Sequence, residues 1–447
     1  TDEQEQIIQK LNIQLSEIIN SKVWRMGLII RRIRVFVVPP NSIRSHLLLL
    51  IIEILLFPFK PIRKFLGRYK HVDNQINRNI FNKEWYLSMY PDITEAKIDP
   101  YQHYLQHGII EGKLGTPPKI KLEKGQNQFD SSKDTVIVVS HEASRTGAPI
   151  LALNIIQNIQ NKYNVITILL GKGSMEEYFY KASTFIIELN QIQKNPVVLS
   201  YIVDNINKLY NIKFAIVNSL ESRIVVHALS QKYIPTICLV HEFSVCFKPR
   251  GSILEMVLWS NKIIFSSTLT LENALSDNPE LENLTFQVIP QGHCISQTTK
   301  SDSINIDNED ARILKLLRPN DSNKDTLVIL GVGTVQLRKG VDLFIECASK
   351  VVQLCKNKKY RFIWIGKGYD PECDAYYSVY LADQIHRAGL EDVVFFMDET
   401  SRIETAYKAA DVLLISSRLD PLPNVAIDAM MFKLPLICFE KTTGIAD

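Results

Sequence analysis

The stretch DVLLISSRLDPLPNVAIDAM, residues 411–430, decides the fold prediction. Its first apolar residues are typical of a short, buried parallel strand. Pro421 and Pro423 stiffen the loop that follows. The apolar pattern after this loop predicts a helix through residues 425–432, with Asn424 as its N-cap. A buried strand, a rigid loop and a helix in this order indicate an α/β protein.

Two carboxylates flank the predicted start of this helix. Asp420 lies in the loop, and Asp428 lies about one turn into the helix. A helix start attracts anions because its first N–H groups are free and the helix dipole is positive there. One acid can accept hydrogen bonds from sugar hydroxyls and the other from ribose hydroxyls, while the helix start carries a diphosphate. The spacing therefore favours a nucleotide-sugar as the ligand.

Short β-branched runs alternate with helical patterns over most of the chain. This alternation predicts α/β architecture with two doubly wound parallel sheets. We expect a Rossmann-like first half at residues 135–305 and an incomplete second half at residues 306–447, facing each other across a cleft. The expected strands are residues 135–140, 164–170, 214–219, 236–241, 262–267, 285–290, 326–335, 361–366, 393–398, 411–416 and 434–439, and helices of the second half are expected to begin near Gly340, Cys373, Ser401 and Asn424.

The loop after the first strand of the second half, GVGTVQLRKGVDLF (331–344), predicts an anion site. Arg338 and Lys339 stand just before a helix, so two cations join the free N–H groups of a helix start. A diphosphate suits this combination. The loop is not a nucleotide P-loop, which needs G-K-[ST], and Gln336 replaces the third glycine of a dinucleotide fingerprint. A solvated basic turn is the alternative interpretation.

Two loops of the first half carry residues suited to a ligand site. In SHEASRTGAPILAL (140–153), Gly147 allows close backbone approach and Pro149 suits a first helical turn. The run LVHEFS ends a strand with His241 and Glu242. A histidine at the carboxyl end of a parallel strand can hydrogen-bond a substrate, whereas elsewhere a lone histidine is more often a core residue.

The composition is that of a globular protein of two or more domains, with 447 residues and a formal net charge of +3. The seven cysteines are scattered and contain no C-x-x-C pair. Such a set is typical of reduced thiols in a cytosolic protein. The sequence begins without methionine and stops soon after a predicted strand, so we expect a chain trimmed at both ends.

Residues 1–70 are expected to form a basic, apolar helical extension. Between Lys22 and Lys70 there are eleven Lys or Arg residues and a single acid, Glu53. The apolar run at 47–59 is shorter than the roughly twenty residues that a spanning helix needs. The pattern favours the surface of an anionic membrane, and a helical hairpin packed on protein is the alternative. The residues between the charges are aliphatic, which argues against nucleic acid.

A small aromatic module is expected at residues 80–118, followed by a polar linker at 119–134. His103, His107 and Glu111 are spaced for one helical face, as a metal site requires. They lack the H-E-x-x-H arrangement of a metalloprotease, so a packed structural helix is favoured. The stretch NKEWYLSMYPDITEAKIDPYQHYLQHGIIEGKLG resembles modules that accompany bacterial envelope glycosyltransferases.

The loops and strands of both halves together resemble the family 4 retaining glycosyltransferases, which have the GT-B fold. The resemblance runs from about Val136 to the end of the sequence. It is most specific over residues 411–439. This segment begins with a strand and the pattern S-R-x-acid-P. A second acid follows the first after a gap of seven residues, and then come A-M and a proline. The turn at 331–344 and the G-K-G at 366–368 match as well.

This resemblance implies a role for each candidate residue. Lys339, with Arg338 beside it, would bind the donor diphosphate. Asp420 would hold the donor sugar and Asp428 the ribose. By the resemblance the donor-binding residues are Thr334, Arg338, Lys339, Asn424, Val425 and Asp428, the catalytic residues are His241 and Asp420, and the acceptor-side residues are Gly147 and Glu242.

The sequence departs from the family pattern at three points. Both acids are Asp where the family most often has Glu. Thr334 replaces an arginine whose role would fall to Arg338. Pro423 removes a backbone N–H that often serves the donor. These changes bear on the identity of the donor sugar more than on the activity.

The sequence therefore predicts an enzyme that moves a sugar from a nucleoside-diphosphate sugar to a cell-envelope glycan or a lipid-linked acceptor, with retained configuration. No cofactor is expected, and no metal, because no D-x-D follows a strand in the context of a metal site. The expected location is cytoplasmic, on the inner face of the membrane. A nucleotide-sugar epimerase and a non-catalytic scaffold of the same fold are the alternatives.

Overall fold

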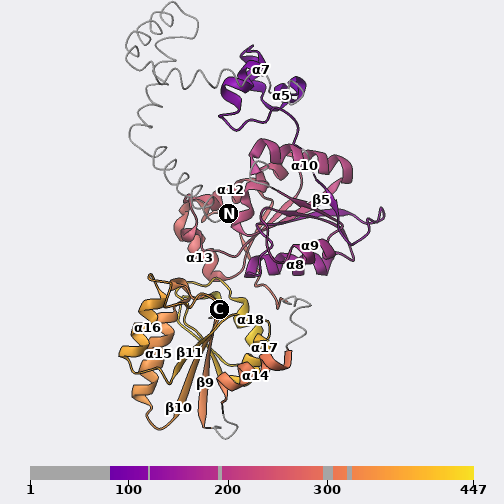
Figure 1. Ribbon diagram of the computed structural model, residues 1–447. Helices are drawn as coiled ribbons and strands as arrows, with labels where there is room; N and C mark the ends of the chain where they lie inside the picture. The colour runs from indigo at the N-terminus through magenta and orange to yellow at the C-terminus, as the bar shows by residue number, and fades with distance from the viewer. Residues whose placement is uncertain (1–80, 119–120, 190–193, 295–305, 320–324, 447) are drawn as a thin grey trace, which may run out of the picture. The chain divides into compact units, whose positions relative to one another are not determined.

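A computed structural model describes residues 81–118, 121–189, 194–294, 306–319 and 325–446 (Figure 1). The predicted basic, apolar extension at residues 1–70 lies outside this part of the chain. Within the described part, no helix combines the length and the apolar character needed to cross a bilayer. The chain divides into two compact units, residues 1–108 and residues 109–447.

The described part of the first unit is a small helical module around aromatic side chains. Trp85, Tyr86 and Tyr90 are buried in it, and the Tyr86 hydroxyl lies 3.0 Å from Nδ1 of His103. His103 therefore belongs to the aromatic interior, as the structural interpretation of this segment predicted. The module consists of α5 (Lys83–Met89), α6 (Pro91–Glu95), α7 (Pro100–His103) and the π-helix η3 (Tyr104–Gly108).

The first half of the second unit contains an eight-stranded sheet. Its strands are β1 (Glu123–Lys124), β2 (Thr135–Ser140), β3 (Asn164–Leu169), β4 (Phe185–Glu188), β5 (Ile212–Asn218), β6 (Thr236–Val240), β7 (Lys262–Phe265) and β8 (Gln287–Val288). They lie in the order β1-β4-β3-β2-β5-β6-β7-β8, and all neighbours are parallel except β1 and β4. Two short strands were not predicted: β1 has only two residues, both charged, and the apolar residues of β4 come so soon after the preceding helix that they resemble the end of that helix.

Helices cover both faces of this sheet (Figure 1). Every residue of β2 and β3 is buried, which explains why apolar residues occupy both faces of these strands instead of alternating with exposed polar ones. Ile137 and Val139 pack with α10 on one face, and Val136 and Val138 pack with α8 and α9 on the other. The helices are α8 (Gly147–Ile159), α9 (Glu176–Ala182), α10 (Pro196–Tyr210), α11 (Val226–Gln231), α12 (Ser252–Trp259) and α13 (Thr268–Asp277), with 3-10 turns η5 (Leu220–Val225), η6 (Ser244–Cys246) and η7 (Pro279–Leu281).

The second half contains a five-stranded, wholly parallel sheet. Its strands are β9 (Thr326–Val332), β10 (Lys359–Ile365), β11 (Val394–Met397), β12 (Val412–Ile415) and β13 (Leu436–Cys438), in the order β11-β10-β9-β12-β13. The helices and turns between and beside them are α14 (Ile306–Leu317), η9 (Leu337–Lys339), α15 (Val341–Leu354), α16 (Ser378–Arg387), α17 (Ile403–Ala409), α18 (Asn424–Met431) and η10 (Gly444–Ala446).

Two apolar layers enclose this second sheet. On one face, α15 and α16 pack on the sheet through Phe344 and Leu381. On the other face, α17 and α18 pack through Tyr407 and Ala426. Figure 1 shows α15 and α16 on one side of the strands and α14, α17 and α18 on the opposite side. The prediction of two doubly wound α/β halves is confirmed.

Two predicted helix starts need correction. α16 begins at Ser378 instead of Cys373, because Asp374 forms a turn and accepts hydrogen bonds from the N–H groups of Tyr376 and Ser378. Asn424 is the first residue of α18 and not its N-cap. Pro423 occupies the cap position without a side-chain hydrogen bond, because a proline side chain offers no acceptor.

Candidate functional site

The carboxyl ends of β9 and β10 approach each other so closely that two positions require glycine. A Cβ atom at Gly366 would lie 2.0 Å from the carbonyl oxygen of Gly333, too close for any other residue. That carbonyl accepts a hydrogen bond of 2.8 Å from Nε1 of Trp364. Gly333 itself has a φ of 143°, and the side chain of Lys339 passes over it. The glycine turn therefore holds a lysine against the ends of two strands.

Arg338 and Lys339 lie in η9, the turn between β9 and α15. Gly340 ends this turn with a φ of 66°, a left-handed conformation that glycine adopts without strain. A Cβ atom there would lie 2.0 Å from the carbonyl oxygen of Ser416, just after β12. The basic turn is thus packed directly against the loop that carries Asp420. The sequence predicted both loops but not this contact.

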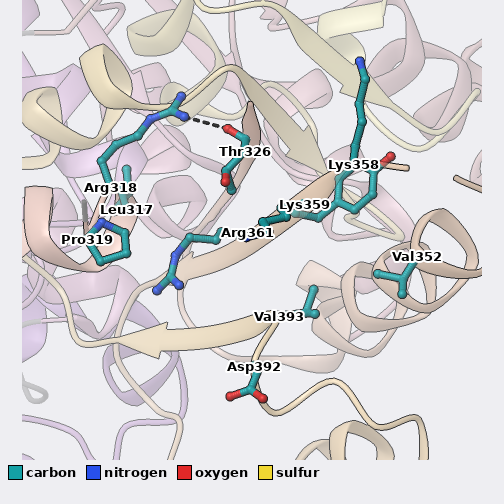
Figure 2. Close-up of a pocket in the computed structure, with 11 residues that line it drawn as sticks. Leu317, Arg318, Pro319, Thr326, Val352, Lys358, Lys359, Arg361, Asp392 and Val393 are labelled. Carbon is teal, nitrogen blue, oxygen red and sulfur yellow. Dashed lines mark hydrogen bonds between the residues drawn. The ribbon is translucent and has the colours of Figure 1, made fainter. Parts of the chain in front are cut away.

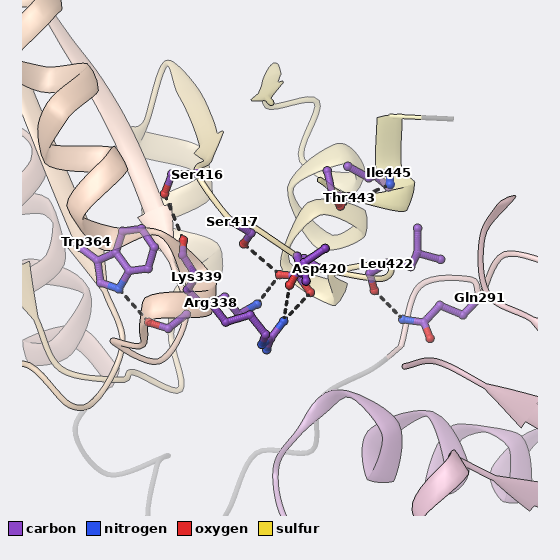
Figure 3. Close-up of polar contacts among 12 residues, drawn as sticks. Gln291, Arg338, Lys339, Trp364, Ser416, Ser417, Asp420, Leu422, Thr443 and Ile445 are labelled. Carbon is purple, nitrogen blue, oxygen red and sulfur yellow. Dashed lines mark hydrogen bonds and ion pairs between the residues drawn. The ribbon is translucent and has the colours of Figure 1, made fainter. Parts of the chain in front are cut away.

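Asp420 is the centre of a charged cluster (Figure 3). Its side chain is 8% exposed, and Nζ of Lys339 lies 2.5 Å from its Oδ2 atom. Nη1 of Arg338 lies 3.4 Å from the Oδ1 atom, and the Ser417 hydroxyl donates to Oδ2 over 3.1 Å. Two cations therefore surround one buried carboxylate at the carboxyl edge of the sheet, where ligands bind in this architecture.

A second ion pair fixes the loop between Ser416 and Asp420. Arg418 donates two hydrogen bonds, of 2.8 and 2.7 Å, to the two carboxylate oxygens of Asp342, and the Tyr377 hydroxyl donates to the same acid over 2.7 Å. Burial raises the pKa of Asp342, but the hydrogen bonds from Arg418 and Tyr377 outweigh it and lower the pKa overall. These three residues were not predicted, although Arg418 and Asp342 lie within the two predicted loops.

Asp428 lies on α18, apart from the Asp420 cluster. Its Oδ1 atom is buried, makes no hydrogen bond to the described residues, and lies 3.4 Å from Nε2 of His293. Burial raises the pKa of this carboxyl to about 6; the charge of His293 opposes that shift and the charge of Glu404 adds to it. No sequence pattern singled out His293, which follows the last strand of the first half.

Several contacts join the first-half residues to the loop before α18. Nε2 of Gln291 donates to Oδ1 of Asn424 and, over 3.4 Å, to the carbonyl oxygen of Leu422 (Figure 3). The Ser267 hydroxyl donates to the carbonyl oxygen of Pro421 over 3.1 Å. A Cβ atom at Gly147 would lie 3.5 Å from Nδ2 of Asn424, so this glycine faces the same loop. Val425, next in α18, and Thr334, after β9, are partly exposed.

His241 lies at the carboxyl end of β6, and its side chain is held by Asn218. The Asn218 amide nitrogen donates to the carbonyl oxygen of Ala148, so its Oδ1 atom faces Nε2 of His241 at 2.9 Å. Nε2 therefore carries the hydrogen, and the buried Nδ1 atom is left as a hydrogen-bond acceptor for which residues 81–118, 121–189, 194–294, 306–319 and 325–446 supply no partner. Burial lowers the pKa of His241, which keeps the imidazole neutral near pH 7.

Glu242, the neighbour of His241, is engaged within the first half. One carboxylate oxygen accepts a hydrogen bond from the Ser219 hydroxyl. The other accepts from the N–H groups of Leu220 and His241, over 3.1 and 3.0 Å. This carboxylate therefore orders the start of η5 and the turn after β6. It thereby fixes the backbone position of His241.

A cavity of about 260 Å³ lies at the opposite edge of the second sheet, by the amino ends of β9 and β10 (Figure 2). Arg318, which lines it, donates to the carbonyl oxygens of Thr326 and Ala409 and to the carboxylate of Asp411. Its charge is therefore already balanced. Because ligands of doubly wound sheets bind at the carboxyl ends of strands, we place the candidate site around Asp420 and not in this cavity.

Comparison with known proteins agrees with this architecture. The α/β fold with two parallel sheets is that of the GT-B glycosyltransferases. Residues 314–447 match the family described as glycosyl transferases group 1. These residues contain the Arg338–Lys339 turn, both acids and all of α18. A search of curated proteins found no match.

Two solved structures illustrate the similarity of fold. Anabaena Alr3699/HepE in complex with UDP-glucose is 16% identical, with a TM-score of 0.53 over 70% of this chain and 82% of that chain. A glycosyltransferase from Rickettsia africae ESF-5 is 18% identical, with a TM-score of 0.51 over 70% of this chain and 80% of that chain.

Proposed function

We propose that this chain transfers a sugar from a nucleoside-diphosphate sugar to a cell-envelope glycan or a lipid-linked acceptor, with retention of the anomeric configuration. The observation that carries the proposal is the pairing of Arg338 and Lys339 with the buried Asp420 at the carboxyl edge of the second sheet. The group 1 match over the same residues supports it. The UDP-glucose bound to the Anabaena protein of the same fold makes UDP-sugars the first donors to try.

The cations are assigned to the leaving group. As the bond between the sugar and the diphosphate breaks, negative charge builds on the departing phosphate oxygens. Lys339 and Arg338 stabilise that charge, and preorganised cations of this kind lower such barriers by several kcal/mol, on the order of 3 for a single donor. Asn424 and Val425 add the first N–H groups of α18, where the helix dipole is positive. These four groups take the place of a metal ion in this proposal, so transfer is expected to proceed without one.

The two acids are assigned to hydroxyl recognition. Asp420 accepts hydrogen bonds from hydroxyls of the donor sugar once the diphosphate has drawn Lys339 away from it. Asp428 accepts from the ribose hydroxyls through the carboxylate oxygen that is not buried. Aspartate is shorter than glutamate by one methylene, so the donor lies closer to the loop at residues 420–424 than a glutamate would require.

His241 is assigned to the reacting end of the donor sugar. Its buried Nδ1 atom is a neutral acceptor with no partner among the described residues, so a sugar or acceptor hydroxyl that reaches this atom can donate to it. Gly147, at the start of α8, leaves the space beside Asn424 open for the acceptor. The basic, apolar sequence of residues 1–70 suits an acceptor held at the cytoplasmic face of a membrane.

The experiment is a donor panel. The full chain is incubated with UDP-, GDP-, dTDP- and ADP-sugars, with and without EDTA, and nucleotide release is measured. We expect release from one donor, unchanged by EDTA and lost in both Lys339→Ala and Asp420→Ala. Lys350→Ala, which removes an exposed lysine paired with Glu346 on α15, is the matched control and keeps the activity. Donor binding without release, even with membrane extract, would instead indicate a non-catalytic scaffold, and an altered sugar without an acceptor would indicate an epimerase.

A further inference from the structure

Three buried polar atoms on α17 and α18 have no hydrogen-bond partner in the part of the chain that the structure describes. They are Oδ1 of Asp428, the hydroxyl of Tyr407 and Oε2 of Glu404. Tyr407 is only 2% exposed; burial raises its pKa, and the charges of Asp428 and Glu404 raise it further, so the three groups lie in one neighbourhood. Buried polar atoms without partners are costly, on the order of 1–3 kcal/mol each, and their presence calls for an explanation.

The two carboxylate oxygens of Asp428 have different surroundings. One carboxylate oxygen is buried, but the side chain as a whole remains 25% exposed, so the other oxygen is accessible. A carboxylate in this position accepts hydrogen bonds from ribose hydroxyls best when it is ionised and does not rotate. The buried oxygen therefore needs a donor that holds it in place.

The ionisable groups that face Asp428 come from two segments of the chain. Glu404 and Tyr407 lie on α17, and His293 and Cys294 follow β8 in the first half. Glu404 carries like charge, and Tyr407 and Cys294 are neutral near pH 7 because their pKa values are raised. Only His293 among these four can carry positive charge, and its Nε2 atom lies 3.4 Å from the buried oxygen.

We propose that His293 is a positioning residue of the donor site, which holds the Asp428 carboxylate ionised and oriented toward the ribose of the nucleotide. The proposal rests on the proposed function, because it assumes that Asp428 binds ribose. His293 reaches the acid from the first half of the unit, so the nucleotide pocket is built from both halves. The imidazole is 37% exposed and is free to close the remaining gap when a nucleotide binds.

The pairing makes nucleotide binding depend on pH in a defined direction. Burial raises the pKa of Asp428 to about 6, so the carboxyl gains a proton as the pH falls through that value and becomes a poorer acceptor. His293 opposes the rise. Removing His293 therefore moves the loss of affinity to higher pH, by about one pH unit for an opposite charge at this distance.

The test measures the dissociation constant of UDP, or of the nucleotide that the donor panel selects, from pH 5 to pH 8 by calorimetry. The titration of the Asp428 carboxyl carbon is followed by NMR without nucleotide, with Asp428→Asn to assign the signal. We expect both midpoints near pH 6 in the unaltered chain and about one pH unit higher in His293→Ala. His293→Gln keeps an N–H donor without the charge, so we expect it to bind as tightly as the unaltered chain at pH 8 but to have midpoints as high as those of His293→Ala.

His386→Ala is the matched control, because His386 pairs with Glu391 at 2.8 Å on the exposed side of α16. This variant should leave the pH dependence of the dissociation constant and the titration of the Asp428 carboxyl unchanged. Superimposable curves for His293→Ala and the unaltered chain would overturn the proposal. If no nucleotide binds at any pH while the carboxyl midpoint still shifts in His293→Ala, the pairing stands but the ribose role falls together with the proposed function.

Discussion

Lys339 and Asp420 are 81 residues apart in the sequence, yet the Nζ atom of one lies 2.5 Å from the Oδ2 atom of the other. Both side chains are largely buried, at 16% and 8% exposure. The ammonium group assigned to the diphosphate is therefore already neutralised by an acid of the same site. A donor has to replace this pairing, so the two residues should respond differently to substitution.

Asp420→Asn should separate binding from transfer. The amide keeps the shape of the carboxylate but removes the charge that holds Lys339, so the lysine becomes available to phosphate. We expect UDP, which lacks the sugar, to bind as tightly as before or up to about tenfold tighter. Sugar transfer should fall at least about a hundredfold, since the hydroxyl acceptor and the charge are lost. Loss of UDP binding in parallel with transfer would contradict this assignment.

Lys339→Gln should weaken the binding of every diphosphate-bearing donor. The charge-assisted hydrogen bond that is lost is worth about 1.5–3 kcal/mol, which corresponds to roughly a tenfold to hundredfold higher dissociation constant. Calorimetry with UDP and with uridine distinguishes the role, because uridine has no phosphate and should be unaffected. An equal loss for both ligands would place Lys339 away from the diphosphate.

The Arg418–Asp342 pair should contribute stability that depends on pH. The pKa of Asp342 is lowered in the folded chain, so its contribution is present above the ordinary pKa of about 4 and is lost as the pH falls through the lower, folded value. Arg418→Lys removes the two-pronged geometry and should cost about 1–2 kcal/mol at pH 7. Urea unfolding measures this loss. The difference in unfolding free energy between Asp342→Asn and the unaltered chain should shrink toward pH 3. A difference that stays constant from pH 7 to pH 3 would argue against the ion pair.

Residues 1–70 should bind anionic membranes. Eleven basic residues between positions 22 and 70 each add about 1 kcal/mol near such a surface. We expect the full chain to sediment with phosphatidylserine vesicles and not with neutral ones, and to release at high salt. Vesicle binding that is unchanged after removal of residues 1–70 would disprove this role.

The sequence was sufficient for the fold because its strands are buried on both faces. Runs such as TVIVVS at β2 and DVLLI at β12 are apolar without alternation, and parallel strands flanked by helices are the common source of that pattern. The strand β4 escaped prediction because its three apolar residues begin only three positions after the end of α9 and resemble a continuation of that helix. The start of α16 was predicted too early. In the turn before the helix, Asp374 accepts hydrogen bonds from the N–H groups of Tyr376 and Ser378, as a residue at the start of a helix does.

The candidate site was only partly predictable for a different reason. Loops at strand ends are visible in the sequence, so Lys339 and Asp420 were named from their own surroundings. Their contact depends on the order of strands in the sheet, in which β9 lies next to β12. Sequence spacing does not contain that order. The same limitation hid Asp342 as the partner of Arg418, and it hid His293, which approaches Asp428 from the first half.

The central claim is that the Lys339–Asp420 site transfers a sugar and does more than bind a nucleotide. The most direct measurement supplies a radiolabelled donor, selected by the panel, to the full chain together with bacterial membrane extract, and counts the label in the lipid and glycan fractions. The account predicts incorporation by the unaltered chain that is lost in Asp420→Asn although this variant still binds UDP. Binding of the donor by both proteins with no label in any acceptor fraction would contradict it.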